Sequence, residues 1–225
     1  MSVPFRLYVI SQRDRMEPDP AEAVVTLARA GLKAFQWREK DLSPAENHAA
    51  ARSICGALAR EGLAAPTAAG DRSRDDRFHL FINDRADLAL SLDLDLHLAE
   101  ASMPTEAVRR ILHPGRLIGR STHSLRSATE AEGAGADFIT FGPVFATPSK
   151  AAYGPPQGLE ALAAICRAIS IPVFALGGID EERAAACRAA GAHGVAVIGA
   201  VWNSGDPVAA IGRLEAAVSL GRRPD

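Results

Sequence analysis

Short apolar runs alternate with longer, alanine-rich amphipathic runs along the whole chain of 225 residues. Most of the short runs are rich in apolar residues and are interpreted as strands buried on both faces of a parallel sheet. The eight runs span residues 6–10, 33–37, 79–83, 94–98, 116–120, 137–141, 171–176 and 194–198. Eight strands alternating with helices predict an α/β fold, a (β/α)8 TIM barrel in which residues 1–225 form a single domain.

The segments between these runs carry helix start and stop signals. Pro20 opens one segment and Gly31 closes it, while Asp180 is a predicted N-cap for a helix that ends at Gly191. The alternative fold is an open doubly wound sheet, but no G-x-G-x-x-G motif follows the first strand. The polar stretch 65–78 is expected to be an exposed loop before the third strand, with no role assigned.

Charge and composition restrict the partners. The net charge is −2 and no polybasic tract is present, so we expect neither a nucleic acid nor a membrane surface as partner. No apolar run approaches the roughly 20 residues that span a bilayer, and the apolar start is too short for a signal peptide. Cys55, Cys166 and Cys187 lack metal-binding spacing, which favours a reduced, cytoplasmic protein. The oligomeric state stays open, a homo-oligomer included.

Polar residues follow almost every predicted strand, at the end of a barrel where active sites lie. They include Arg38, Lys40, Asn83, Asp84, His97, Glu100, Ser102, Arg120, Ser121, His123, Thr147, Ser149 and Lys150. If the second strand continues to residue 40, Gln36, Arg38 and Lys40 share one face. Such cations and hydroxyls suit a phosphate or pyrophosphate group. Asp84 fits among them if a divalent cation such as Mg²⁺ bridges it to phosphate oxygens.

Two further features bear on function. The motif "LGGID" places Gly177 and Gly178 just before a helix start, where backbone N–H groups bind anions, although a plain turn is the alternative. His123 is a candidate acid or base near neutral pH, with a structural role as the alternative.

Taken together, the motifs resemble thiamine-phosphate synthases and the related TenI-type thiazole tautomerases. The resemblance covers nearly the whole chain through "LYVIS", "FQWREKDLS", "FINDRADLAL", "IGRSTHS", "GADFITFGPVFATPSK", "IPVFALGGI" and "GAHGVAVIGAV". It implies a (β/α)8 barrel of cytoplasmic thiamine biosynthesis. The synthase couples a hydroxymethylpyrimidine diphosphate to a thiazole phosphate and releases pyrophosphate, so small phosphorylated molecules are the implied partners and Mg²⁺ the implied cofactor.

The resemblance also implies residue roles. Gln36, Arg38 and Lys40 match residues that hold the diphosphate substrate. Other matched positions are the diphosphate ligands Asn83 and Lys150, the Mg²⁺ ligand Asp84, the hydroxyl contacts Ser121, Thr147 and Ser149, and the thiazole-phosphate loop Gly177 and Gly178 with Ile198 and Gly199 nearby. Arg38, Lys40 and Lys150 are the residues expected to stabilise the leaving pyrophosphate.

One departure from the family pattern separates three hypotheses. After the fourth strand the synthase pattern reads H-x-G-Q-x-D, and its Asp is a second Mg²⁺ ligand, whereas this chain reads "HLAEAS" with Ser102 at that position. The stretch "GRSTHS" leans toward the tautomerases, in which the residue matching His123 moves protons. The first hypothesis is the synthase, the second is a thiazole tautomerase, and the third is a non-catalytic relative that binds thiazole phosphate.

Overall fold

The computed structural model describes residues 3–63, 77–147 and 155–220. In this part of the chain eight parallel strands close into a barrel, each paired with the next and β8 with β1. The strands are β1 (Leu7–Ile10), β2 (Ala34–Trp37), β3 (His79–Asn83), β4 (Asp95–Leu98), β5 (Ile118–Thr122), β6 (Phe138–Phe141), β7 (Val173–Leu176) and β8 (Gly194–Val197). The predicted (β/α)8 barrel is confirmed. Of the predicted loop at 65–78, residues 65–76 lie outside the described residues.

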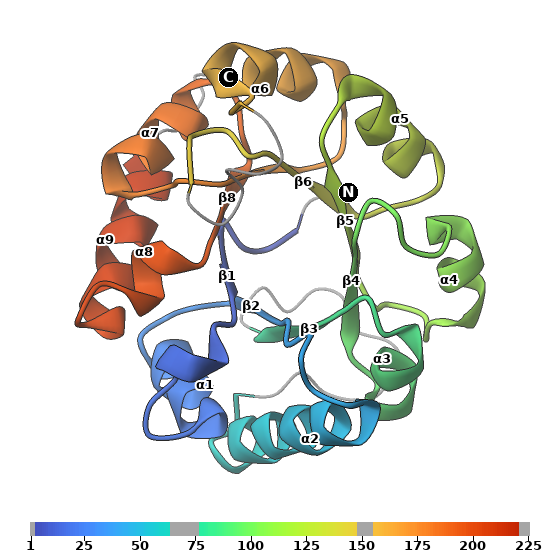
Figure 1. The fold of residues 1–225 in the computed structure, drawn as a ribbon, viewed down its shortest axis with the longest axis vertical. Helices are drawn as coiled ribbons and strands as arrows, with labels where there is room; N and C mark the ends of the chain where they lie inside the picture. The colour runs from blue at the N-terminus through green and yellow to red at the C-terminus, as the bar shows by residue number, and fades with distance from the viewer. Residues whose placement is uncertain (1–2, 64–76, 148–154, 221–225) are drawn as a thin grey trace.

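Helices surround the strands as an outer ring (Figure 1). They are η1 (Arg13–Arg15), α1 (Pro20–Arg29), α2 (Pro44–Arg60), α3 (Ala86–Leu92), α4 (Thr105–Ile111), α5 (Leu125–Gly133), α6 (Gly158–Ala168), α7 (Glu181–Ala189), α8 (Gly199–Trp202) and α9 (Pro207–Leu220). The predicted caps are present, since the Asp180 carboxylate accepts the Arg183 N–H at 2.9 Å and fixes the start of α7. None of the helices in the described ranges is long and apolar enough to cross a membrane.

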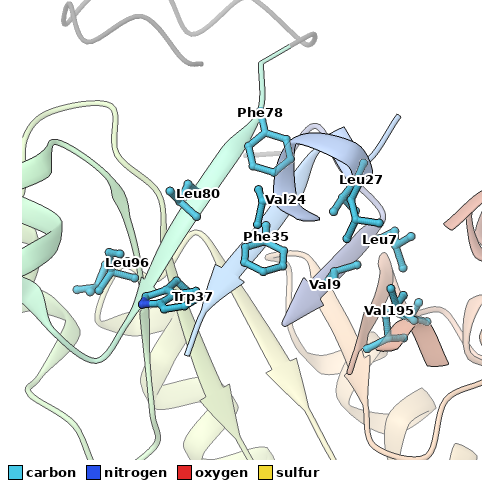
Figure 2. Close-up of a cluster of buried hydrophobic side chains, with 14 of the residues drawn as sticks. Leu7, Val9, Val24, Leu27, Phe35, Trp37, Phe78, Leu80, Leu96 and Val195 are labelled. Atoms are coloured by element: carbon cyan, nitrogen blue, oxygen red, sulfur yellow. The ribbon is translucent and has the colours of Figure 1, made fainter. Parts of the chain in front are cut away.

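Two apolar layers hold the barrel together, one on each side of the strands. The outer layer packs alternate strand residues against the helices, and Figure 2 shows part of it: Leu7, Val9, Val24, Leu27, Phe35, Trp37, Phe78, Leu80, Leu96 and Val195. Each fully buried side chain of this size contributes about 1.5–3 kcal/mol. The inner layer is aromatic and consists of Phe5, Tyr8, Phe81, Phe138 and Phe174 with smaller residues. The barrel interior is therefore packed with side chains.

Several strand ends differ from the predicted runs by one or two residues, and two places matter for the site. β5 starts at Ile118, two residues later than expected, because the Leu117 N–H donates to the Asp95 carboxylate at 2.8 Å and the preceding Arg116 pairs with Asp93. Arg120 and Ser121 consequently lie inside this strand. β2 ends at Trp37, so the strand alternation considered for residues 34–40 stops before Arg38.

Candidate active site

The last two side chains of β2, a buried amide and a buried indole, lie on opposite faces of the strand. Gln36 points into the barrel, where its side-chain amide donates to the Tyr8 hydroxyl at 3.0 Å. Burial raises the pKa of Tyr8 well above its ordinary value, so the phenol stays neutral. Trp37 points outward and its ring N–H donates to the Asn47 side chain of α2 at 2.9 Å. Gln36 is thus fixed on the inner face of the barrel.

Beyond β2 the chain is held by the loop that follows β1. The Arg38 N–H donates to the Ser11 hydroxyl at 2.8 Å, and Ser11 in turn donates to the Glu39 carboxylate at 2.5 Å. Burial raises the pKa of Glu39, although Ser11 and Arg13 partly oppose the rise. Within the described ranges neither the Arg38 guanidinium nor the exposed Lys40 ammonium forms a hydrogen bond or an ion pair. Two cations are therefore available to an anionic ligand.

Asp84 lies directly after β3 and next to the loop after β4. Its backbone is left-handed, with φ of 65°, a conformation that aspartate tolerates better than most residues. The Asp84 N–H donates to the His97 carbonyl at 2.8 Å, and the Ser102 hydroxyl donates to the Asp84 carboxylate. Asn83, the last residue of β3, is half-buried beside it. The structure therefore brings the predicted metal ligand and Ser102 into direct contact.

Arg120 ties down the loop that carries Ser102. Its guanidinium donates to the backbone carbonyls of Glu100 at 2.9 Å and Met103 at 2.6 Å, and to the Thr105 hydroxyl at 3.3 Å. Burial lowers the pKa of Arg120, and the charges of Asp84 and Glu100 act against this. An arginine with these bonds fixes the loop and also places positive charge near Asp84.

Glu100 and His123 form a hydrogen-bonded pair at this end of the barrel. The His123 Nδ1 lies 2.8 Å from one Glu100 oxygen, and the His123 backbone N–H donates to the other oxygen at 3.2 Å. Partial burial raises the pKa of Glu100, but hydrogen bonds from Ser127 and His123 outweigh it and lower the pKa overall. Both side chains of the pair are about two-fifths exposed, at 42% for His123 and 40% for Glu100. The imidazole is therefore oriented by a carboxylate and open to solvent.

A second polar group lies inside the barrel just below the loops. The His97 Nε2 is 3.0 Å from the Ser121 hydroxyl, and the Thr140 hydroxyl is 3.4 Å from the same Ser121 oxygen. Sequence reasoning did not select Thr140. Its place in run 137–141, on the same face as Phe138, was the available signal.

The glycine pair after β7 packs against the loop after β6. Gly177 and Gly178 have φ of 101° and 64°, and a Cβ on Gly178 would lie 2.5 Å from the Ala146 carbonyl oxygen. Arg183 donates to the Gly178 carbonyl at 2.7 Å, and its guanidinium lies 5.0 Å from the centre of the Phe145 ring. Only glycine fits this close approach.

The remaining predicted residues divide between described and undescribed parts of the chain. Ile198 follows β8 and is partly buried, and Gly199 opens α8. Thr147 is partly buried at the end of the described loop after β6. Ser149 and Lys150 lie outside the described residues, so their roles stay predictions.

The residues around Asp84 fit Mg²⁺ only with help from a substrate. No group of three or more His, Cys, Asp or Glu side chains in the described ranges could hold a metal ion. Asp84 offers one carboxylate, and Ser102 offers a neutral hydroxyl beside it. Mg²⁺ is commonly bound through one or two carboxylates together with substrate phosphates, which this donor set allows.

Comparison with known proteins agrees with this geometry. The family model described as "Thiamine monophosphate synthase" matches residues 7–201. The chain belongs to this family. It is 39% identical to the thiamine-phosphate synthase of Roseiflexus sp. over 95% of this chain and 85% of that protein, and 40% identical to the thiamine-phosphate synthase of Anaeromyxobacter dehalogenans over 91% and 85%.

A solved structure of the same family is also similar. The thiamine phosphate pyrophosphorylase from Pyrococcus furiosus superimposes with a TM-score of 0.81 at 31% identity, covering 98% of each chain. The family, the barrel and the enzyme class predicted from the sequence are confirmed.

Proposed function

We propose that this family member catalyses thiamine-phosphate synthesis, coupling a hydroxymethylpyrimidine diphosphate to a thiazole phosphate with release of pyrophosphate. The observation that supports it most is the pair of cations, Arg38 and Lys40, that have no partner among the described residues. They follow β2 at the end of the barrel where Asp84 follows β3. Unpaired cations beside a carboxylate suit a diphosphate with its metal ion.

In the proposed mechanism the carbon–oxygen bond between the pyrimidine methylene and the diphosphate breaks first. The pyrophosphate takes the bonding electrons, and Arg38, Lys40 and Lys150 stabilise its growing negative charge. Asp84 would hold Mg²⁺, which would supply further positive charge to the leaving group. The thiazole nitrogen then donates its lone pair to the pyrimidine methylene cation and forms the new carbon–nitrogen bond.

The protein otherwise acts by positioning the two substrates. We assign the diphosphate substrate to Gln36 and Asn83 together with the cations. The thiazole phosphate is assigned to the backbone N–H groups around Gly177 and Gly178, next to Ile198 and Gly199. The hydroxyls of Ser121, Thr147 and Ser149 are assigned as further substrate contacts.

Pyrophosphate release in the presence of both substrates tests this proposal. We expect Mg²⁺-dependent release with stoichiometric thiamine phosphate, and a loss of about a hundredfold in kcat/KM for Arg38→Gln. Arg29→Gln is the matched control, because Arg29 pairs with Glu61 on the helix ring and not with the site. Absence of release by the native protein, or equal effects of both variants, would reject the assignment.

The Glu100–His123 pair favours a second candidate function, thiazole tautomerisation. A carboxylate that orients an imidazole is a common arrangement for proton transfer. Isomerisation of the thiazole, followed by NMR, should then fall about a hundredfold in His123→Gln, whereas coupling to the pyrimidine should persist. An unchanged isomerisation rate would remove this candidate. Turnover of either substrate set would remove the hypothesis of a non-catalytic relative.

A further inference from the structure

His97 is buried in the barrel with one ring nitrogen that has no hydrogen-bond partner. That nitrogen is Nδ1. It lies against the backbone of Gly119, since a Cβ at that position would be 2.6 Å from it. The ring packs on Phe138, with centroids 5.8 Å apart, and on Tyr8, with centroids 5.6 Å apart. Nδ1 therefore faces carbon atoms.

The surroundings of His97 determine which nitrogen carries its proton. A doubly protonated ring would also carry an N–H on Nδ1, which is buried without a hydrogen-bond partner, so the geometry favours a ring with a single N–H. An N–H on Nδ1 would point at Gly119 with no acceptor, and a buried N–H without an acceptor is costly. An N–H on Nε2 instead donates to the Ser121 oxygen at 3.0 Å. The Nε2–H tautomer is the one that the structure favours.

This tautomer fixes the direction of the Ser121 hydroxyl. The Ser121 oxygen accepts from His97 and also from the Thr140 hydroxyl at 3.4 Å. A hydroxyl oxygen has two lone pairs, so both are then in use and only its proton is left to bond. Within the described ranges no acceptor takes that proton. Ser121 is only partly buried near the C-terminal end of β5, so its free bonding direction is open to a ligand.

We propose that His97 is a positioning residue that holds the Ser121 hydroxyl as a hydrogen-bond donor to an acceptor atom of the diphosphate substrate. The proposal rests on the proposed function, which places that substrate at this end of the barrel. A neutral donor of this kind adds directionality to the charge of Arg38 and Lys40.

The first test uses the unaltered protein. Long-range proton–nitrogen NMR correlations of ¹⁵N-histidine-labelled protein distinguish the two neutral tautomers, with the His97 signals assigned by their absence in His97→Gln. We expect the Nε2–H form at neutral pH. An Nδ1–H form, or a doubly protonated ring, at neutral pH would overturn the proposal whatever the enzyme activity is.

The second test is a double-mutant cycle on steady-state kinetics. His97→Phe keeps a ring and removes the donor, whereas His97→Gln keeps an N–H close to the place of Nε2. We expect Phe to raise the KM for the pyrimidine diphosphate about tenfold, Gln to stay within about threefold, and the Phe effect to vanish in a Ser121→Ala background.

The outcomes distinguish a failure of the positioning role of His97 from a failure of the proposed function. Additive losses in the cycle, or a Gln variant as impaired as the Phe variant, would overturn the role of His97 while leaving synthesis intact. If Ser121→Ala left the KM for the pyrimidine diphosphate unchanged, Ser121 would not contact the substrate, and this result would overturn the proposal as well. If His97→Phe does not fold, the tautomer measurement and the Gln variant still decide.

Discussion

Ser102 donates a hydrogen bond to the carboxylate of Asp84, so the two side chains are in contact at the end of the barrel. In the synthases that the sequence resembles, an aspartate stands where this chain has Ser102. The serine carries no negative charge where that pattern has one. Among the described residues Asp84 is then the one carboxylate assigned to Mg²⁺, and the free protein should bind the ion weakly.

The first prediction concerns Ser102→Asp. Adding a carboxylate beside Asp84 should raise the affinity of the substrate-free protein for Mg²⁺ at least about tenfold, as measured by isothermal titration calorimetry. Ser102→Asn is the matched control, since it changes size without adding charge. An affinity that is the same in both variants would show that position 102 does not face the metal.

Arg120 gives a second prediction because it bonds the loop after β4 at several points. Arg120→Gln should lower the free energy of unfolding by about 1–3 kcal/mol and also raise the KM for the diphosphate substrate, since the loop carries Ser102. Urea denaturation and steady-state kinetics measure the two effects. Arg126→Gln, which breaks the exposed pair with Glu130, should leave the free energy of unfolding almost unchanged. Equal effects of the two variants would contradict the bracing role.

The barrel could be predicted because short runs rich in apolar residues alternate with segments that carry helix start and stop signals, and this pattern can be recognised without knowledge of long-range contacts. The pattern predicted β5 two residues early because the Asp95 carboxylate, from another strand, takes the Leu117 N–H. Likewise, Glu39 turns toward Ser11 through a contact between residues 28 positions apart. Such side-chain bonds across the barrel leave no local pattern in the sequence.

The residues of the candidate site could likewise be predicted only in part from the sequence. Strand-end position identified Gln36, Arg38 and Asp84, since polar residues after a strand need no tertiary information to be noticed. Thr140 was overlooked because its partner Ser121 lies on the neighbouring strand, 19 residues away. The consequence of Ser102 depended on knowing that it touches Asp84, which only the fold provides.

The third prediction is a loss of stability in mild acid. Burial, with Arg6, lowers the pKa of His193 to about 4, and burial lowers that of His97 to about 3. An unfolded histidine has a pKa near 6.5, so below this value the unfolded chain binds protons that the folded chain does not. The stabilisation is complete above pH 6.5 and is lost as pH falls toward 4 and 3.

Between pH 7 and pH 5 each of these histidines should therefore lower the free energy of unfolding by about 2 kcal/mol. Urea denaturation at the two pH values measures the change. Because other groups also titrate, the informative quantity is the difference between the native protein and His193→Gln. That variant should lose about 2 kcal/mol less over the same interval, and an identical pH dependence would contradict the shift.

The fourth prediction separates backbone strain from steric fit at Gly178. Gly178→Ala should be destabilised for two reasons. Its backbone has a left-handed φ of 64°, and its Cβ would lie 2.5 Å from the Ala146 carbonyl oxygen. Gly62→Ala is the matched control, because Gly62 has φ of 67° with no atom within 4 Å of an added Cβ. The control should lose about 1 kcal/mol of stability with unchanged kinetics.

Gly178→Ala should lose clearly more stability than Gly62→Ala and should raise the KM for the thiazole phosphate about tenfold or more. The KM for the pyrimidine diphosphate should stay within about twofold, because most of its assigned contacts, Gln36, Arg38, Lys40 and Asn83, lie in or directly after β2 and β3, on the other side of the barrel. Chemical denaturation and kinetics with each substrate varied in turn give all the values. A rise in both KM values alike would indicate a general disturbance of the barrel end, and the separate thiazole-phosphate site at Gly177 and Gly178 would then be wrong.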